Sequence, residues 1–267
     1  MPEMTADFSS QGDGKEQMPA MGFLEHLEEL RRRIFYALGA VVVGFFACWA
    51  YAERIYEVMQ RPIMDALRHN NMPEKLVYLN PTEPFNMYLK VAFLAGLFVT
   101  SPFVLYQVWA FIAPGLYRHE KRYVTPFMIS TVALFLAGGY FGYRLVYPQA
   151  LEFLISYGKQ FQPMITIGEY TDLFLTIIIG MGVIFEMPIL VFFLSLMGIV
   201  TAGWMWRNLR YSILVIFIIA AIITPTTDIM NMCIFAAPMV ALYVVSIAIA
   251  WLVHPKQRRA RAEKKKS

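Results

Sequence analysis

The amino-acid sequence predicts an all-α integral membrane protein with six transmembrane helices, both termini on the cytoplasmic side, a short fifth helix and exterior loops capped by short helices and turns. Three observations predict this class. Of the 267 residues, 58% are hydrophobic and only 16% are charged, and the mean hydropathy is +0.51. Apolar segments long enough to cross a membrane recur along the chain. Lys and Arg gather in alternate flanks and loops.

Six apolar segments define the predicted spans: residues 34–52, 91–113, 124–146, 173–200, 211–223 and 229–253. A hydrocarbon core of about 30 Å takes about 20 helical residues, so four of the segments cross it comfortably. The fifth measures only about 20 Å as a helix, because each residue adds about 1.5 Å. We expect it to thin the bilayer or to lie behind its neighbours. The short turn TPTTD predicts that it forms an antiparallel hairpin with the sixth segment.

Basic residues predict the orientation. An even number of spans places both termini on one side, and the positive-inside rule makes that side cytoplasmic. The residues that set it are Arg31 to Arg33, then Arg118, Lys121 and Arg122, then Arg207 and Arg210, and the tail KQRRARAEKKKS. The same rule accounts for the pI near 9.0 without nucleic-acid binding. The basic tail and the lack of a transit peptide favour the inner (cytoplasmic) membrane of a bacterium.

The domain organisation follows from these spans. We expect a disordered cytosolic leader over residues 1–21, one transmembrane domain over 22–253 and a basic cytosolic tail over 254–267. The leader is polar and lacks the basic region and apolar core of a cleavable signal. The first exterior loop balances acidic with basic residues and is rich in proline, which predicts short helices and turns at the outer face.

Enzymatic chemistry has no support in the sequence. The chain contains no G-x-S-x-G turn, no H-E-x-x-H pair and no glycine-rich phosphate loop. Cys48 and Cys233 lie in apolar runs and are interpreted as small buried hydrophobic residues. His26 and Glu29, three residues apart, form only a weak metal signal. We therefore predict a protein that is not an enzyme and has no metal site and no cofactor.

Two acidic residues occupy unusual positions. Glu186, in GVIFEMPIL, lies in the fourth span with no basic neighbour in the sequence, so it must face protein or a wet cavity, or be protonated. Either it makes a structural hydrogen bond near a kink at Pro188, or it belongs to a functional polar cavity. Asp228, in the exterior hairpin turn, is either a turn and helix N-cap residue or a functional acid.

The acids of the cytoplasmic face also allow two interpretations. Glu28 and Glu29 precede Arg32 and Arg33 by four residues, which is the spacing of helical ion pairs, and such exposed pairs contribute little to stability. The same carboxylates, together with Glu120 in the second loop, would bind guanidinium groups through paired charge-assisted hydrogen bonds at a partly dehydrated interface. Acids at two places on one face would suit a ligand with two adjacent arginines.

Several motifs, in order along residues 22–253, resemble the TatC family, the multispanning core of the twin-arginine protein translocase. The longest and most specific is SPFVLYQVWAFIAPGLYRHEKR, residues 101–122. The others are HLEELRRRI (26–34), TEPF (82–85), FEMP (185–188), MGI (197–199), TPTTD (224–228) and AAPMVALY (236–243).

The resemblance implies a receptor that binds signal peptides with two consecutive arginines at the cytoplasmic face. Such receptors pass folded proteins across the membrane and use the proton motive force. By the same resemblance Glu29 and Glu120 are signal-binding carboxylates, and Arg31 and Phe111 support that site.

The resemblance also implies partners. Family members work with single-span subunits of the TatA and TatB type, which dock along the fifth and sixth helices, and we expect assembly with further copies of the chain and contact with lipid. Glu186 matches the family's acid on a concave membrane-embedded face, and Asp228 matches the acid of the last exterior turn. Met232 stands where some members carry a glutamine for a partner contact. Structural roles fall to three prolines: Pro62, Pro102 and Pro188.

Two other functions remain open from the residues alone. A secondary transporter would use Glu186 and Asp228 as a proton relay, and its loop acids would serve only local ion pairs. A structural scaffold would bind no substrate through any of these acids. The receptor differs from both because it needs Glu29 and Glu120.

Overall fold

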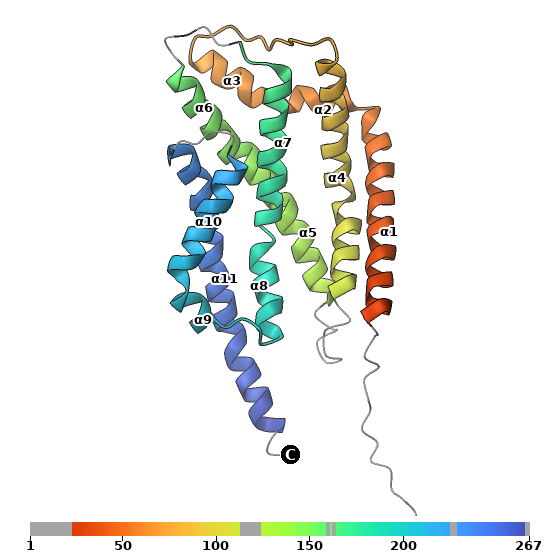
Figure 1. Ribbon diagram of the computed structural model, residues 1–267, viewed down its shortest axis with the longest axis vertical. Coiled ribbons are helices and arrows are strands. Elements are labelled where there is room, and N and C mark those ends of the chain that lie inside the picture. The colour runs from red at the N-terminus through yellow and green to blue at the C-terminus, as the bar shows by residue number, and fades with distance from the viewer. Residues whose placement is uncertain (1–22, 113–123, 159–160, 162–163, 225–228, 265–267) are drawn as a thin grey trace, which may run out of the picture.

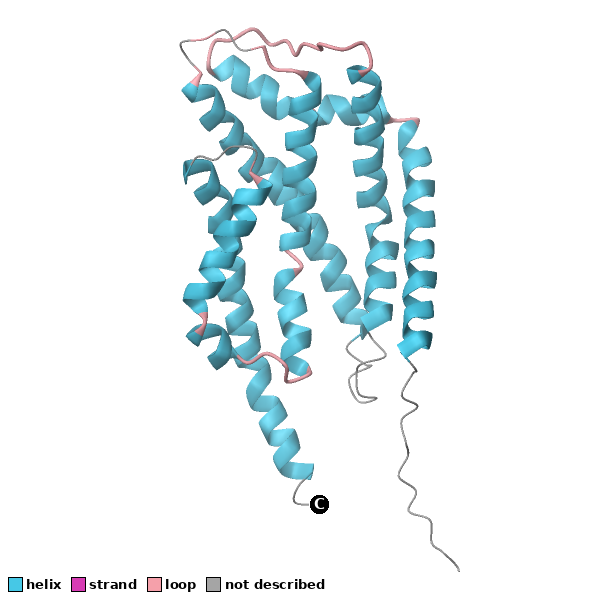
Figure 2. Cartoon of the chain, in the orientation of Figure 1, coloured by secondary structure: helices cyan, strands magenta, loops and turns pink. Residues whose placement is uncertain are grey.

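The structure is a computed structural model that describes residues 23–112, 124–158, 161, 164–224 and 229–264, and these are almost entirely helical (Figures 1 and 2). Glu120 and Asp228 lie outside the described residues. The elements are α1 (Phe23–Trp49), α2 (Ala52–Met59), α3 (Arg61–His69), α4 (Glu83–Ile112), α5 (Val124–Phe141), the π-helical turn η3 (Gly142–Val146), α6 (Tyr147–Tyr157), α7 (Ile167–Ile184), α8 (Met187–Leu196), α9 (Ala202–Arg207), α10 (Leu209–Ile223) and α11 (Ile229–Lys264).

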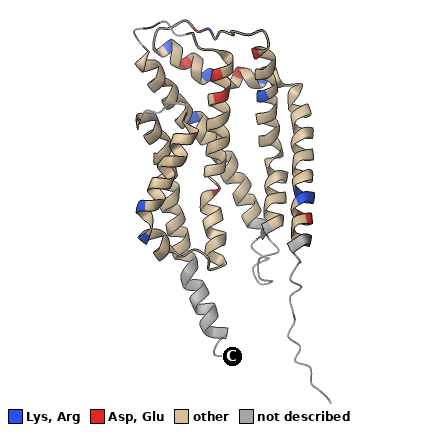
Figure 3. Ribbon diagram, in the orientation of Figure 1, with Lys and Arg blue, Asp and Glu red and all other residues tan. Residues whose placement is uncertain are grey.

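The predicted class, an all-α membrane protein, is confirmed. Among the described residues, five helical stretches are long and apolar enough to cross a membrane: Glu25–Trp49, Glu83–Phe111, Phe127–Tyr157, Ile167–Leu196 and Met232–Leu252. The short fifth segment is α10, whose 15 residues give about 22 Å of helix. Charged side chains gather at the two ends of the bundle and are sparse between them (Figure 3). That distribution fits an apolar slab around the middle of the molecule.

Several helices are longer than their apolar segments. α4 begins at Glu83 and not near residue 91, and the third span continues through η3 and α6 to Tyr157. The difference has a physical cause, because backbone hydrogen bonds and caps end a helix, whereas hydropathy marks only the part that lipid covers. α7, for example, begins where the Thr166 hydroxyl accepts a hydrogen bond from the Glu169 amide.

Pro102 lies inside α4 without ending it. Because proline has no N–H, the Phe98 carbonyl four residues earlier loses its helical donor. The hydroxyl of Ser101, a buried residue, donates to that carbonyl at 2.7 Å. The Ser101 hydroxyl therefore replaces the donor that Pro102 lacks, and the helix continues to Ile112.

The fourth span is divided where the sequence predicted a kink. α7 ends at Ile184, α8 begins at Met187, and Pro188 lies in the first turn of α8. Phe185 and Glu186 connect the two helices with backbone angles still in the right-handed helical region. Glu186, expected in the middle of one helix, therefore lies at a helix break.

The short helices α2 and α3 lie across one end of the bundle, as expected of a capped loop (Figure 1). The Tyr143 hydroxyl of η3 donates to the Val58 carbonyl at 2.8 Å, and the Tyr170 hydroxyl of α7 donates to the Met59 carbonyl. Pro62, buried in the first turn of α3, has no N–H to offer the Val58 carbonyl four residues earlier. Two tyrosines from the spans thus hold the carbonyl end of α2.

α1 is connected to the rest of the bundle chiefly through α4, and most of its surface is exposed. The two helices approach most closely at two glycines. A methyl group added at Gly96 would come within 2.6 Å of the Phe45 nitrogen, and one added at Gly44 within 2.6 Å of Thr100 Cγ2. By contrast, nothing lies within 4 Å of the position where Gly39 would carry a methyl group.

This close approach generates a prediction. Gly96→Ala should destabilise the protein by about 1–3 kcal/mol, because the neighbouring backbone of α1 has to move. Gly39→Ala, on the open face of the same crossing, should leave stability unchanged or raise it, since alanine favours helix over glycine. Thermal unfolding in detergent would measure both variants, and equal stability of the two would refute the close contact.

Candidate functional site

Glu29 is a buried acid at the amino end of α1. Its side chain is only 9% exposed, and its Oε1 atom accepts hydrogen bonds from Arg33 Nε at 3.0 Å and Arg33 Nη2 at 2.6 Å. This is the helical ion pair that the spacing of four residues predicted. Glu28 and Arg32, the other pair with this spacing, are both exposed.

Only one of the two oxygens of the Glu29 carboxylate accepts a hydrogen bond within the described residues. Its Oε2 atom is buried and has no hydrogen-bond partner among the described residues. The guanidinium of Arg33 also extends to α4, where its Nη1 atom lies 3.4 Å from Oε1 of the buried Gln107. An acceptor that is shielded from water and still open is suited to a charged donor from outside the chain.

Aromatic rings border this site. The His26 ring of α1 stacks on the Phe111 ring of α4, with centroids 4.4 Å apart and planes 17° from parallel. The structure thus brings Phe111 to the face of α1 that carries His26 and Glu29, three residues apart. Arg31, two residues after Glu29 in α1, is exposed. No cluster of ligands that could hold a metal ion is found in the described part of the chain, so the weak metal signal of His26 and Glu29 gains no support.

Sequence reasoning missed Gln107. It lies within the motif of residues 101–122, and its spacing in that motif does not single it out. A buried amide within an apolar run is itself a signal, because a polar group in such a place needs a hydrogen-bond partner. The partner, Arg33, lies 74 positions away in the sequence, and only the packing of α1 on α4 brings the two together.

Glu186 has no structural hydrogen bond among the described residues. Both of its carboxylate oxygens are buried and without a partner. The nearby contacts are aromatic, with Phe185 packed against Phe141 of α5 at 5.4 Å between ring centroids. The interpretation as a hydrogen bond at the Pro188 kink is therefore not supported, and a membrane-embedded polar site remains.

The predicted partner position, Met232, lies in the first turn of α11. Met232 is half-buried and packs against the main core. Further along, the Tyr243 hydroxyl accepts from Ser212 Oγ at 2.7 Å and donates to the Met205 carbonyl at 3.1 Å. This one hydroxyl joins α9, α10 and α11, which gives the motif AAPMVALY a structural reason for its last residue.

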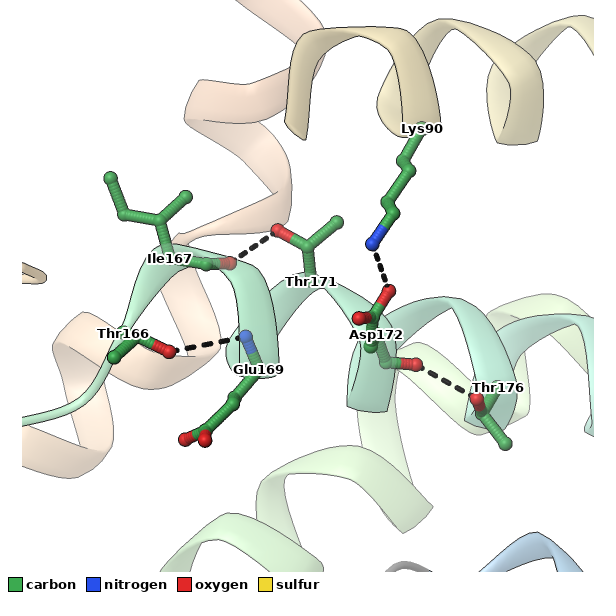
Figure 4. Close-up of polar contacts among 7 residues, drawn as sticks. All are labelled: Lys90, Thr166, Ile167, Glu169, Thr171, Asp172 and Thr176. Atoms are coloured by element: carbon green, nitrogen blue, oxygen red, sulfur yellow. Dashed lines mark hydrogen bonds and ion pairs between the residues drawn. The ribbon is translucent and has the colours of Figure 1, made fainter. Parts of the chain in front are cut away.

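A polar cavity of about 320 Å³ lies between the amino-terminal parts of α4 and α7, at the end of the bundle away from Glu29. Lys90 of α4 reaches Asp172 of α7 and closes one side of it (Figure 4). Hydroxyls of Thr171 and Thr176 donate to carbonyls within α7 at 2.7 and 2.8 Å. Lys90 and Asp172 are both well exposed, so this pair is a surface contact between helices and adds little stability.

The state of Glu186 can be tested by stability. Glu186→Gln should leave the thermal stability unchanged or raise it, because an unpartnered buried carboxylate costs free energy that a neutral amide avoids in part. Tyr170→Phe is the matched control and should cost about 1 kcal/mol, since its hydroxyl has a partner in the Met59 carbonyl. Loss of stability in Glu186→Gln comparable to that of Tyr170→Phe would show a structural hydrogen bond at Glu186.

The fold defines the class of protein: a multi-pass helical membrane protein with a buried acid near one membrane surface and another at the break of a spanning segment. The chain belongs to the TatC family, because residues 25–238 match the family model of the Sec-independent protein translocase protein (TatC).

Individual relatives also support membership of the TatC family. A Sec-independent protein translocase protein TatC from Koribacter versatilis (strain Ellin345) is 72% identical over 249 residues, which cover 93% of this chain and 92% of that protein. The TatC of Aquifex aeolicus (strain VF5) is 34% identical over 89% of this chain and 98% of its own length. Two crystal structures described as the twin-arginine translocase receptor TatC, one of them in DDM, superpose with a TM-score of 0.77 at 33% identity. They match over 86% and 85% of this chain and 99% of each of theirs.

Proposed function

We propose that this chain is the core receptor subunit of a twin-arginine translocation system. It binds twin-arginine signal peptides at its cytoplasmic face, and folded proteins then cross the membrane at the expense of the proton motive force. The observation that carries the proposal is the Glu29 carboxylate near the amino end of α1. It is buried, and one of its oxygens has no partner among the described residues. Its role is binding and assembly, without catalysis, metal or cofactor.

In this proposal Glu29 and Glu120 receive the two arginines of the signal peptide. Phe111, stacked on His26, limits access of water from the side of α4 and so strengthens hydrogen bonds to the carboxylate. Arg31, which is exposed in the same helix, supports the site by binding a carboxylate of the peptide or a lipid phosphate.

The proposed topology has six crossings with both termini in the cytoplasm of a bacterium whose inner membrane holds the protein. The leader of residues 1–21 and the tail of residues 254–267 flank the transmembrane domain of residues 22–253. Arg207, the last residue of α9, and Arg210, in the first turn of α10, support this orientation. In Figure 1, α9 lies toward the same end of the bundle as the amino end of α1. Trp204 and Trp206 of α9 are exposed at that end, as interfacial tryptophans are.

Single-span partners of the TatA and TatB type dock along α10 and α11 in this proposal. α10 is too short to cross the bilayer alone and exposes large apolar side chains, among them Leu214, Ile218 and Ile222. In this proposal Asp228 and Met232 belong to the partner contact, and Glu186 supplies a polar group within the membrane. Further copies of the chain and lipid complete the assembly, and no nucleic acid is involved.

The proposal is tested by peptide binding. The purified protein in nanodiscs should bind a signal peptide with two arginines more tightly than the same peptide with two lysines. Glu29→Gln should weaken binding of the arginine peptide by about tenfold or more, because a hydrogen bond to a charged group is lost. Glu120→Gln should also weaken it. The exposed Glu28→Gln is the control for charge and should keep most of the affinity.

Equal and weak binding of both peptides by every variant would contradict the proposal. If binding required Glu186 and Asp228 and ignored Glu29, a transport function with a membrane-embedded proton relay would replace it.

A further inference from the structure

We propose that Arg33 competes with the substrate for Glu29, and that this internal competition sets the preference for arginine over lysine. The inference deepens the proposed function and rests on it. It starts from an arrangement that the sequence alone presented as an ordinary helical ion pair. In the free receptor, the carboxylate assigned to a substrate guanidinium already holds a guanidinium of the chain itself.

The pair is stronger than an exposed helical pair. Two nitrogens of Arg33 donate to the same oxygen, at 3.0 and 2.6 Å, and the exposed fractions are 21% for Arg33 and 9% for Glu29. Water therefore screens the pair only in part. Among the described residues, one oxygen of Glu29 is buried without a partner and the other accepts from Arg33. Full use of Glu29 by a cation from outside therefore requires Arg33 to withdraw.

Gln107 is an alternative hydrogen-bond acceptor for Arg33 when it leaves Glu29. Its Oε1 atom lies 3.4 Å from Arg33 Nη1, on the side of the guanidinium that faces α4. This distance is at the long limit for a hydrogen bond and would shorten if the guanidinium moved toward α4. Gln107 therefore keeps a donor of Arg33 paired when the guanidinium releases the carboxylate.

The competition discriminates between the two basic side chains. A substrate arginine brings a planar fork of donors of the same kind that Arg33 gives up, so one guanidinium replaces another. A substrate lysine brings a compact ammonium, which is more strongly hydrated and lacks the fork geometry. Replacing Arg33 by a substrate lysine is therefore less favourable than replacing it by a substrate arginine. In this way Arg33, which the peptide displaces, makes the receptor selective for arginine.

The experiment measures affinity for the arginine and lysine peptides in nanodiscs, for the wild type, Arg33→Gln and Arg32→Gln. Both variants lose one positive charge from the same helix, but Arg32 is exposed and outside the Glu29 contact. Arg33→Gln should raise the affinity for the lysine peptide more than for the arginine peptide. The ratio of the two affinities should fall by about fivefold relative to the wild type. In Arg32→Gln both affinities should shift together and the ratio should stay.

The possible outcomes distinguish failure of the Arg33 competition from failure of the receptor function. A wild-type preference for arginine that depends on Glu29 and survives unchanged in Arg33→Gln overturns the competition and leaves the receptor function standing. Equal loss of affinity for both peptides in Arg33→Gln also overturns it, because Arg33 would then only position Glu29. A wild type with no preference dependent on Glu29 overturns the proposed function and this inference together.

A conservative pair covers the case in which Arg33→Gln does not fold. Arg33→Lys keeps the charge but loses the two-nitrogen hold on Glu29, and Arg32→Lys is its control. The ratio should fall in Arg33→Lys and stay in Arg32→Lys, and an unchanged ratio in both would overturn the competition.

Discussion

The packing of α1 on α4 is the contact on which the candidate site depends. α1 has little other support, and the approach at Gly44 and Gly96 is too close for any side chain larger than hydrogen. One end of this crossing places Glu29 and Arg33 beside Gln107 and His26 against Phe111. A rotation or separation of the two helices would therefore change the charge pairing and the aromatic border at the same time. Small residues allow close helix packing in membranes, where apolar burial alone cannot draw helices together.

Elsewhere in the bundle several polar groups are satisfied by nearby residues, as an apolar surrounding demands. Ser101 repairs the carbonyl that Pro102 leaves open, two tyrosines hold the end of α2, and Tyr243 joins three helices. Against this background, the acids with unpartnered oxygens are informative. Among the described residues, Glu29 and Glu83 each have one such oxygen and Glu186 has two. A buried carboxylate oxygen without a partner marks a place where a ligand, a partner or a proton can bind.

Much of the fold could be predicted from the sequence, because a helix that crosses lipid needs a long apolar segment. The spans, the short α10, the capped loop and the break near Pro188 all follow from such patterns. The amphipathic helix α9, the π-helical turn η3 and the true starts of α4 and α7 do not. They depend on caps and on contacts with distant residues, such as Tyr143 with Val58, which hydropathy does not record. Within the site, the pairing of Glu29 with Arg33 follows from local spacing, whereas Gln107 and the stacking of His26 on Phe111 arise only from tertiary packing.

The central claim is that Glu29 accepts a guanidinium from a bound peptide. A direct measurement is the distance between a spin label that replaces the exposed Glu28 and a second label on the peptide, next to its arginine pair. The account predicts one short, well-defined distance for the arginine peptide, lost in Glu29→Gln and broadened for the lysine peptide. A distance distribution that is the same for both peptides and indifferent to Glu29 would contradict it.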